Sequence, residues 1–470
     1  MLCRIKNMTR NKTFAFLLAF AIGCGCLFGC NAEKDQGKTT KELTLQEYEE
    51  AQFILSGYWQ PHDLTVESFT LYKNAGLNNL LMGYHDDDEW SSGSRSYLGS
   101  EQTLKNLELC REVGLTATLN FGEIYKKRID GTGYGETPFS DYDLYGEYKD
   151  IITSVHIYDE PRKEHIDNLS STSLISDYKS VYSVPYYINL YPDYANVATL
   201  GFKTYDEYLD YYDEKILSQF EDNKMVSVDY YPFRASGFQT GWLANLKKIA
   251  ELSKKHSART NFYIQTAEGN EFKTELSEQD IRLQVYVSLA FGATNLSYYC
   301  YSDPNEDGDS MYEYCMLNPD KTPSVLYSYV KEINEEISSF SSAFLAYSWV
   351  ECMGYTDTSD GNGSVALAML RTNADFSDRR YVASLASDGD CLIGVFERES
   401  DEAYMLVNYG DPEVTSEYVY CIELKNGALG VAVYGGDGNI GSPEIIRADD
   451  NGKCDIKIKA GEGKFVVPLI

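Results

Sequence analysis

The stretch that decides the fold runs from Thr103 to Phe121 and reads TLKNLELCREVGLTATLNF. Its first half carries apolar residues at three- and four-residue spacing, which predicts a helix, and its last six residues form a short run typical of a buried strand. Between the two, Val113-Gly114-Leu115 places a glycine just past the helix end, where a left-handed residue turns the chain back. Ala75-Gly76-Leu77 makes the same junction earlier. The stretch therefore predicts one unit of an alternating α/β chain.

Eight strands of this kind are expected between about residues 50 and 340, and segments of helical period lie between them. The expected strands are Phe53–Tyr58, Asn79–Tyr84, Thr116–Phe121, Ser154–Tyr158, Pro185–Leu190, Met225–Tyr230, Asn261–Thr266 and Asn295–Tyr301. Eight strands alternating with helices over this length predict a (β/α)8 TIM barrel, and we expect it to span residues 49–346. A doubly wound sheet is the alternative. No glycine-rich nucleotide-binding motif supports it.

The pattern changes from about residue 347. Short strands alternate with Gly, Asp and Asn turns, and we expect no helix there. The expected strands are Val382–Leu385, Leu392–Arg398, Ala403–Asn408, Tyr418–Leu424, Gly430–Tyr434, Asp455–Lys459 and Lys464–Leu469. This pattern predicts a smaller C-terminal antiparallel β-sandwich over residues 347–470.

The N-terminal segment predicts export. Basic residues precede an uncharged apolar run from Phe14 to Phe28, which is shorter than the roughly 20 residues of a membrane span. The run closes on Leu27-Phe28-Gly29-Cys30, which resembles the bacterial lipobox, in which the cysteine is acylated. The resemblance implies a signal peptide over residues 1–29, a lipid anchor at Cys30, a polar tether over 30–48 and a place at the cell envelope or cell surface.

Composition excludes several partners. The chain has 72 Asp plus Glu against 41 Lys plus Arg, a net charge of −31, so we expect no nucleic acid partner. Seven cysteines follow Cys30 at irregular spacings without a C-x-x-C, which indicates neither a disulfide framework nor a zinc site. The five histidines show no metal-ligand spacing, and we expect no catalytic metal or cofactor. The 40 tyrosines suit either sugar contact or ordinary half-buried strands.

Active sites of such barrels lie at the C-terminal ends of the strands. The fourth expected strand ends on Asp159-Glu160-Pro161, and the seventh is followed by Ala267-Glu268-Gly269. Carboxylates on these two strands can face each other across the barrel mouth. Retaining glycoside hydrolysis needs such a pair, one carboxyl group as acid/base and one as nucleophile. Taken singly, Asp159–Pro161 is also a common helix start, and Glu268 an ordinary turn residue.

With these two motifs the chain resembles the glycoside hydrolase clan A superfamily, and within it most closely the family 42 β-galactosidases. The resemblance covers about residues 50 to 340. It implies that Glu160 is the acid/base and Glu268 the nucleophile. The clan usually has asparagine where Asp159 stands, and an arginine at the end of strand two, where this chain has Tyr84-His85-Asp86.

Further residues after the strands are candidates for substrate contact. They are Asp159, Tyr231, Asp229, His85, Trp59, Trp90 and Tyr301. Tyr231 is preferred over Tyr230 as a hydrogen-bond donor to the nucleophile, and Asp229 and Glu123 are rival catalytic carboxylates. The sequence thus predicts a retaining glycosidase that acts on a β-linked carbohydrate. The alternative is a non-catalytic surface glycan-binding lipoprotein on the same barrel.

Overall fold

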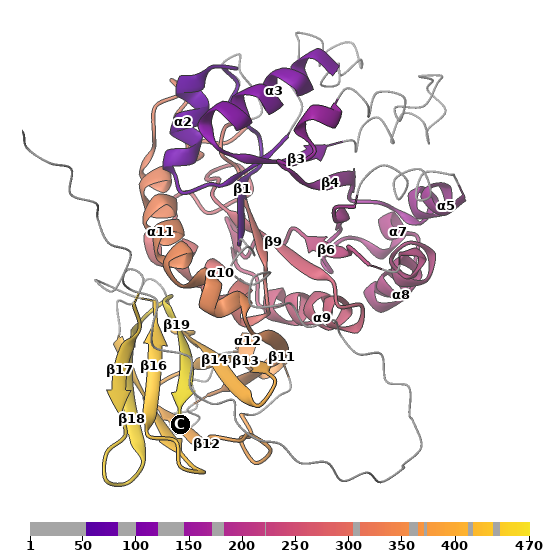
Figure 1. The fold of residues 1–470 in the computed structure, drawn as a ribbon. Helices are drawn as coiled ribbons and strands as arrows, with labels where there is room; N and C mark the ends of the chain where they lie inside the picture. Colours follow the sequence, from indigo (N-terminus) through magenta and orange to yellow (C-terminus); the bar gives the residue numbers. More distant parts are fainter. Residues whose placement is uncertain are drawn as a thin grey trace, which may run out of the picture. The chain divides into compact units, whose positions relative to one another are not determined.

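Eight parallel strands close into a barrel in the computed structural model (Figure 1). The structure describes residues 53–82, 100–120, 145–171, 183–220, 222–303, 311–356, 365–370, 374–411, 417–435 and 442–470. The order around the barrel is β1-β10-β9-β6-β5-β4-β3-β2, and β2 pairs with β1 to close it. The strands are β1 (Ile54–Gly57), β2 (Asn79–Leu81), β3 (Thr116–Asn120), β4 (Ile152–Asp159), β5 (Tyr186–Leu190), β6 (Met225–Val228), β9 (Arg259–Gln265) and β10 (Asn295–Tyr299). The predicted TIM barrel is confirmed, because a doubly wound sheet would leave two open edges.

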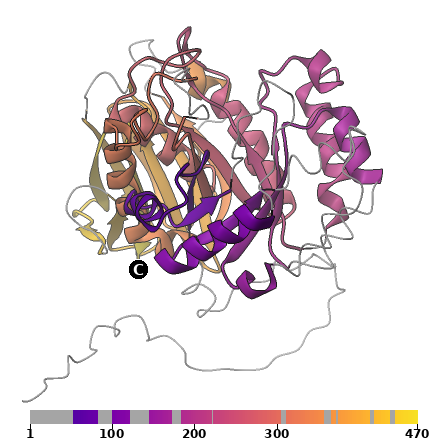
Figure 2. The ribbon, with the colours of Figure 1, turned by 90° about the horizontal axis from the view of Figure 1, so that it is seen from above.

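Helices lie outside the barrel strands in both views (Figures 1 and 2). They are α2 (Val66–Asn74), α3 (Ser100–Val113), α5 (Lys163–Ser171), α7 (Val197–Leu200), α8 (Tyr205–Lys215), α9 (Trp242–Lys255), α10 (Glu278–Ala290) and α11 (Val325–Leu345). Gly76 and Gly114 have φ of +76° and +74°, so the predicted left-handed turns after α2 and α3 are confirmed. A short hairpin, β7 (Phe233–Arg234) with β8 (Gly237–Phe238), lies between β6 and α9 and was not predicted.

Small polar side chains line the barrel interior, whereas the alternate residues of the strands pack in the core beneath the helices. Asn261 lies at the centre of one chain of hydrogen bonds: it donates to Ser227 (2.9 Å) and accepts from Ser297 (3.1 Å). The chain continues from Ser297 to Ser56 and from Ser227 to Asn189. Buried polar groups are stable only when hydrogen-bonded, so these side chains hold one another in place.

The C-terminal part forms two antiparallel sheets around a shared core. One has the order β11-β13-β14-β19-β16-β17 and the other β12-β15-β18. The elements are β11 (Ser348–Tyr355), α12 (Val365–Met369), β12 (Val382–Ser387), β13 (Cys391–Arg398), β14 (Asp401–Asn408), β15 (Glu417–Leu424), β16 (Gly430–Tyr434), β17 (Glu444–Arg447), β18 (Lys453–Lys459) and β19 (Gly463–Leu469). The predicted β-sandwich is confirmed. The expectation of no helix in this region was wrong, because α12 forms one.

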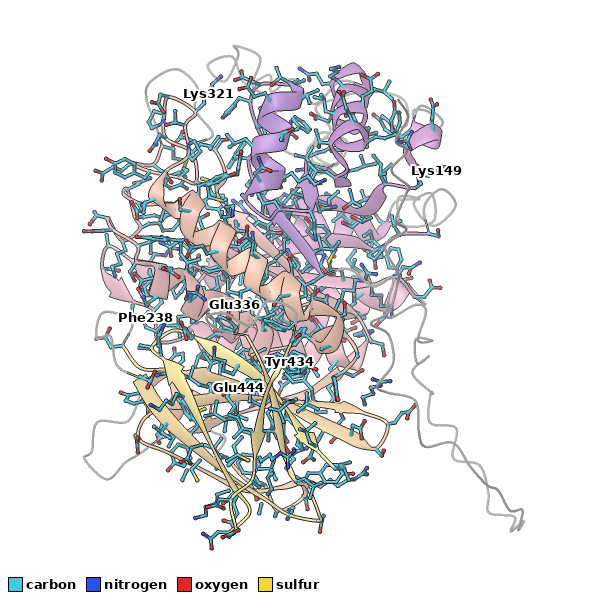
Figure 3. The ribbon with its side chains drawn as sticks, turned by 60° about the vertical axis from the view of Figure 1, so that its left-hand side comes forward. Lys149, Phe238, Lys321, Glu336, Tyr434 and Glu444 are labelled. Carbon is cyan, nitrogen blue, oxygen red and sulfur yellow. The ribbon has the colours of Figure 1, made fainter. Side chains whose placement is uncertain are left out.

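The sandwich packs directly against α10 of the barrel. A Cβ atom added at Gly394 of β13 would lie 2.3 Å from the carbonyl oxygen of Ala290, so only glycine permits this approach. Trp349 donates its indole N–H to the same oxygen at 2.9 Å. On α11, Glu336 accepts hydrogen bonds from the α10 side chains of Arg282 and Tyr286. Figure 3 labels Glu336 on the barrel side of this contact and Tyr434 of β16 on the sandwich side. The sandwich therefore supports the helix that follows the seventh barrel strand.

Across the described residues, no helix combines the length and the apolar character needed to cross a membrane.

Candidate active site

The end of β4 carries the first acidic residue of the site. The register of β4 against β5 shifts between His156 and Tyr158. His156 stacks on Tyr187 of β5 with ring centroids 4.8 Å apart, whereas Tyr158 packs into the core outside the barrel. An extra residue in a strand reverses the alternation of its side chains. The shift therefore turns Asp159 toward Asn189, with which it pairs.

Glu160 follows Asp159 in a left-handed conformation, with φ of +50°. Its N–H donates to the carbonyl oxygen of Asn189 at 2.8 Å, so the main chain still follows β5 at this point. A positive φ is uncommon for residues other than glycine and persists only where the surroundings impose it. The predicted acid/base residue thus stands on a constrained turn between β4 and α5.

Asn189 joins two carboxylates at the barrel mouth. Its Nδ2 donates to Asp159 Oδ1 at 3.1 Å and to Asp229 Oδ1 at 2.9 Å, and its Oδ1 accepts from Ser227 Oγ at 2.9 Å. Both N–H donors of the amide nitrogen are thereby engaged, and the amide oxygen accepts one hydrogen bond. Asn189 is 2% exposed, so it forms a rigid link between the interior network and the acidic residues above it.

The pKa of Asp229 is raised well above its ordinary value. Burial is the largest cause, the negative charges of Glu160 and Asp159 add to it, and the hydrogen bond from Asn189 opposes it. Carboxyl groups at the ends of β4 and β6 thus lie close enough to interact, and like charges at short range favour retention of a proton. We call Asp159, Glu160 and Asp229 the mouth cluster.

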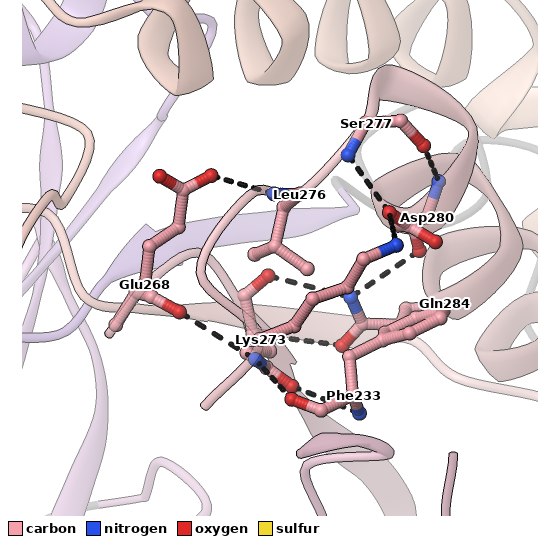
Figure 4. A network of polar contacts seen from close by, with 9 residues as sticks. Phe233, Glu268, Lys273, Leu276, Ser277, Asp280 and Gln284 are labelled. Carbon is pink, nitrogen blue, oxygen red and sulfur yellow. Dashed lines mark hydrogen bonds and ion pairs between the residues drawn. The ribbon is translucent and has the colours of Figure 1, made fainter. Parts of the chain in front are cut away.

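Glu268 lies three residues beyond the end of β9. The acidic residues around it are different from those of the mouth cluster. Its main chain forms a bridge with Tyr314, donating N–H to the Tyr314 oxygen at 2.9 Å. Its Oε1 accepts from the N–H of Leu276 at 2.7 Å (Figure 4). The side chain is 5% exposed. Leu276 leads directly into α10, which begins with a reciprocal cap between Ser277 and Asp280.

Burial is the first cause that raises the pKa of Glu268, and the Leu276 N–H opposes it. The carboxylates that add most to the rise are Glu275, Glu313 and Asp280. Glu275 and Asp280 lie on the loop and helix start after β9, and Glu313 lies on the segment after β10, whereas the acidic neighbours of Asp229 lie at the end of β4. The structure therefore groups Asp159, Glu160 and Asp229 directly, and holds Glu268 in a separate polar arrangement.

Tyrosine rings gather at the ends of β1, β6, β9 and β10. Tyr231 lies 5.1 Å from Tyr299 between ring centroids, and Tyr58 lies 5.6 Å from Tyr299 and 5.8 Å from Tyr263. Asp229 exerts the largest charge effect on Tyr231, whose pKa burial raises well above its ordinary value. Tyr230 instead packs against Tyr194. These contacts bring Tyr231, rather than Tyr230, next to both the tyrosine rings and the mouth cluster.

The other predicted contact residues lie at different depths. Trp59 follows β1 with φ of +58°, is partly exposed and packs edge-on against Tyr58. Tyr301 has no exposed surface and packs 4.8 Å from Tyr72 in the core, whereas Tyr299 is partly exposed. Three candidates and the predicted lipid anchor lie outside the described residues: His85, Trp90, Glu123 and Cys30.

Sequence reasoning missed Asn189, His156, Tyr187 and Tyr263. The signal for Asn189 is a polar residue near the end of an otherwise apolar strand, Tyr186–Leu190. His156 is fully buried, and burial lowers its pKa while Asp159 opposes this effect. Within the described parts of the chain, no group of three or more His, Cys, Asp or Glu side chains is arranged to hold a metal ion.

Comparison with known proteins finds only distant likeness to solved structures. No family model matches the chain, and no curated protein matches it. Among solved structures, a glycoside hydrolase of family 5 from Bacteroides vulgatus is 14% identical, with 89% of each chain covered and a TM-score of 0.49. A family 39 glycoside hydrolase from Bacteroides cellulosilyticus is 12% identical, covering 90% of this chain and 82% of its own, with a TM-score of 0.48. A β-galactosidase from Marinomonas is 11% identical over 62% of this chain and 60% of its own, with a TM-score of 0.42. At these values the likeness carries no argument about activity.

Proposed function

We propose that the protein is a glycoside hydrolase that cleaves a β-linked sugar with retention of configuration. The observation that carries the proposal is the mouth cluster. Asp229 sits beside Glu160 and Asp159, and its burial together with their negative charges raises its pKa, which favours retention of a proton on this carboxyl group. Glycoside hydrolysis requires a carboxylic acid that is still protonated near neutral pH and a carboxylate that is ionised.

Glu160 is the proposed acid/base. It stands at the C-terminal end of the fourth barrel strand, and its neighbours are carboxyl groups that can exchange the proton with it. In the first step its proton passes to the departing glycosidic oxygen while a carboxylate attacks the anomeric carbon. In the second step the same group removes a proton from the water that releases the sugar.

Glu268 is the proposed nucleophile, just after the seventh strand, as the clan resemblance implies. The N–H of Leu276 fixes its carboxylate, which reduces the reorganisation needed before attack. Asp229 is the second candidate for this role, because Glu160 is the charged group that acts on it most strongly. A retaining pair works at a separation of roughly 5–5.5 Å, so only one of the two can attack from a given substrate position.

The proposed substrate is a carbohydrate that lies against the tyrosine rings. Tyr58, Tyr231 and Tyr299 offer flat apolar faces with hydroxyl groups, a combination that suits the faces and hydroxyls of a sugar. A β-galactoside is the first substrate to test because of the family 42 resemblance. We further propose that a lipid at Cys30 holds the enzyme at the cell envelope. A Cys30→Ser variant should then leave the membrane fraction, and its retention there would contradict the anchor.

Hydrolysis of a panel of aryl β-glycosides tests the activity. We expect the full chain, purified in mild detergent, to hydrolyse at least one of them. Glu160→Gln and Glu268→Gln should each lower kcat/KM by about 100-fold or more. Glu251→Gln, on the exposed surface of α9, is the matched control and should retain activity. Binding of glycans without turnover of any member would favour a glycan-binding protein instead.

Trapping of the intermediate identifies the nucleophile. A 2-deoxy-2-fluoro glycoside with a good leaving group should leave the sugar bound to one carboxylate, and peptide mass spectrometry locates it. A label on Glu268 supports the proposed role. A label on Asp229 would instead identify Asp229 as the nucleophile. Release of the inverted anomer, detected by NMR, would contradict retention.

A further inference from the structure

Two buried thiols lie in contact behind the tyrosine rings. The Sγ atoms of Cys300 and Cys315 are 3.0 Å apart, and the residues are 0% and 1% exposed. Cys300 directly follows β10, and Cys315 lies fifteen positions further along the chain. A disulfide bond is about 2.05 Å long, so a relative movement of about 1 Å brings the two sulfurs to bonding distance.

We propose that Cys300 and Cys315 are a modification site and form an intramolecular disulfide when the chain folds in an oxidising environment. The reaction is thiol–disulfide exchange with a disulfide oxidant, either a small molecule or a thiol oxidoreductase. Both thiols lose a proton, one S–S bond forms between Cys300 and Cys315, and the oxidant's S–S bond is reduced to two thiols. The inference does not rest on the proposed activity.

The timing of the reaction follows from burial. A thiolate is the attacking species in exchange, and burial raises the pKa of the Cys300 thiol well above its ordinary value. Neither sulfur is accessible in the folded protein. The disulfide therefore forms during folding, before the surrounding rings close over the pair, and the finished bond is shielded from reductants.

Hydrogen bonds to their carbonyl oxygens hold the main chain of the two cysteines in place. Met316 donates its N–H to the Cys300 oxygen at 3.2 Å, and Ser324 Oγ donates to the Cys315 oxygen at 2.6 Å. Since the main chain on both sides is fixed, the bond needs side-chain rotation and little backbone movement.

The bond would also restrain Glu268. Just before Cys315, the oxygen of Tyr314 accepts from the Glu268 N–H, and the N–H of Glu313 donates to the Glu268 oxygen at 2.8 Å. Gly269 allows this close pairing, because a Cβ there would lie 2.8 Å from the Glu313 Cβ. A link from Cys315 to the end of β10 ties this bridge to the eighth barrel strand. The disulfide is therefore expected to reduce local opening around Glu268.

Disulfide mapping of the native sequence is the direct test. The full chain is unfolded under reducing conditions, refolded in detergent with a glutathione redox buffer, alkylated and digested without reductant. We expect a cross-linked peptide pair that contains Cys300 and Cys315. Alkylation of both thiols, or a stable bond from either one to another cysteine, would overturn the proposal. No substrate is involved, so the outcome does not depend on whether the protein is a glycosidase.

Thermal unfolding provides a second test with a control. Closing a loop of this length should raise the melting temperature of the oxidised protein by about 3 °C over the reduced one. Cys315→Ser should abolish the difference between oxidised and reduced samples. Cys352→Ser, which removes a cysteine of similar burial in β11, should preserve it. An equal response to reductant in Cys315→Ser and the native protein would contradict the assignment.

Discussion

We expect Asp229→Asn to raise the melting temperature of the protein at neutral pH. Asp229 is held beside Asp159 and Glu160 with its pKa raised, so the folded state is destabilised when this carboxyl group ionises. Asparagine has nearly the same shape and keeps an oxygen that can accept the hydrogen bond from Asn189. The substitution therefore removes the repulsion and retains the principal contact.

The size of the effect follows from the geometry at Asn189. One nitrogen donates to Asp159 Oδ1 at 3.1 Å and to Asp229 Oδ1 at 2.9 Å, so the two oxygens are at most about 6 Å apart, the sum of these lengths. Two unit charges at that distance repel by about 3 kcal/mol at an effective dielectric constant of about 20. For a chain of this size, 1 kcal/mol moves the melting temperature by about 1 °C. We therefore expect a rise of about 3 °C at pH 8.

The gain in melting temperature of Asp229→Asn should increase with pH. Because the pKa of Asp229 is raised in the folded protein, its contribution to stability is fully present below the unfolded value of about 3.9 and is lost as pH rises to the folded value. The asparagine variant does not titrate at this position. Its advantage over the native protein should therefore be small at pH 4 and increase toward pH 8.

Scanning calorimetry of the full chain between pH 4 and pH 8 measures this difference. Asp206→Asn on α8 is the matched control, since Asp206 is 70% exposed and pairs with Lys248. We expect that control to change stability by less than about 1 kcal/mol. A lower melting temperature for Asp229→Asn at pH 8, or an equal gain at pH 4 and pH 8, would refute the reasoning.

Three further changes test other parts of the structure. Glu268→Gln should also raise the melting temperature above pH 5, because burial raises the Glu268 pKa and a glutamine oxygen can still accept the hydrogen bond from the Leu276 N–H. A loss of stability that is the same at pH 4 and pH 8 would contradict this expectation. Gly394→Ala should lower stability to urea by about 1–3 kcal/mol through the clash at α10, whereas Gly146→Ala, with no atom within 4 Å, should not. Glu402→Ala should lower the free energy of unfolding by at least about 3 kcal/mol, because the Glu402 carboxylate accepts hydrogen bonds from three backbone N–H groups in the sandwich. A change below about 1 kcal/mol would show that water replaces the carboxylate.

The sequence predicted the elements whose signals are local. All eight barrel strands lie where short apolar runs stand, and the left-handed turns follow from Gly76 and Gly114. Strand β17 was missed because its residues are mostly exposed, so no alternation of apolar and polar residues marks it. The β7–β8 hairpin has strands of two residues each, too short for any period to appear.

The site was harder to predict because its geometry depends on pairing between distant segments. The position of Glu268 is set by the main chain of Glu313 and Tyr314, more than 40 residues away, and by the start of α10. Its role as nucleophile stays a prediction. Asn189 was missed because one asparagine in an apolar strand carries no motif, and its importance comes from Asp159 and Asp229 on the neighbouring strands.

The register shift in β4 explains why Asp159 and Asp229 lie on the same side of Asn189. Strict alternation from Ser154 and His156 would turn Tyr158 inward and Asp159 outward. The extra residue places Tyr158 in the outer core and Asp159 opposite Asn189. The amide nitrogen of Asn189 can only donate hydrogen bonds, so its bond to Asp229 lowers the pKa of that carboxyl group, whereas burial and the charges of Glu160 and Asp159 raise it. Asp229 is thus the carboxyl group on which burial and repulsion act against the hydrogen bond from Asn189, and the register shift in β4 is what brings Asp159 to that same amide nitrogen.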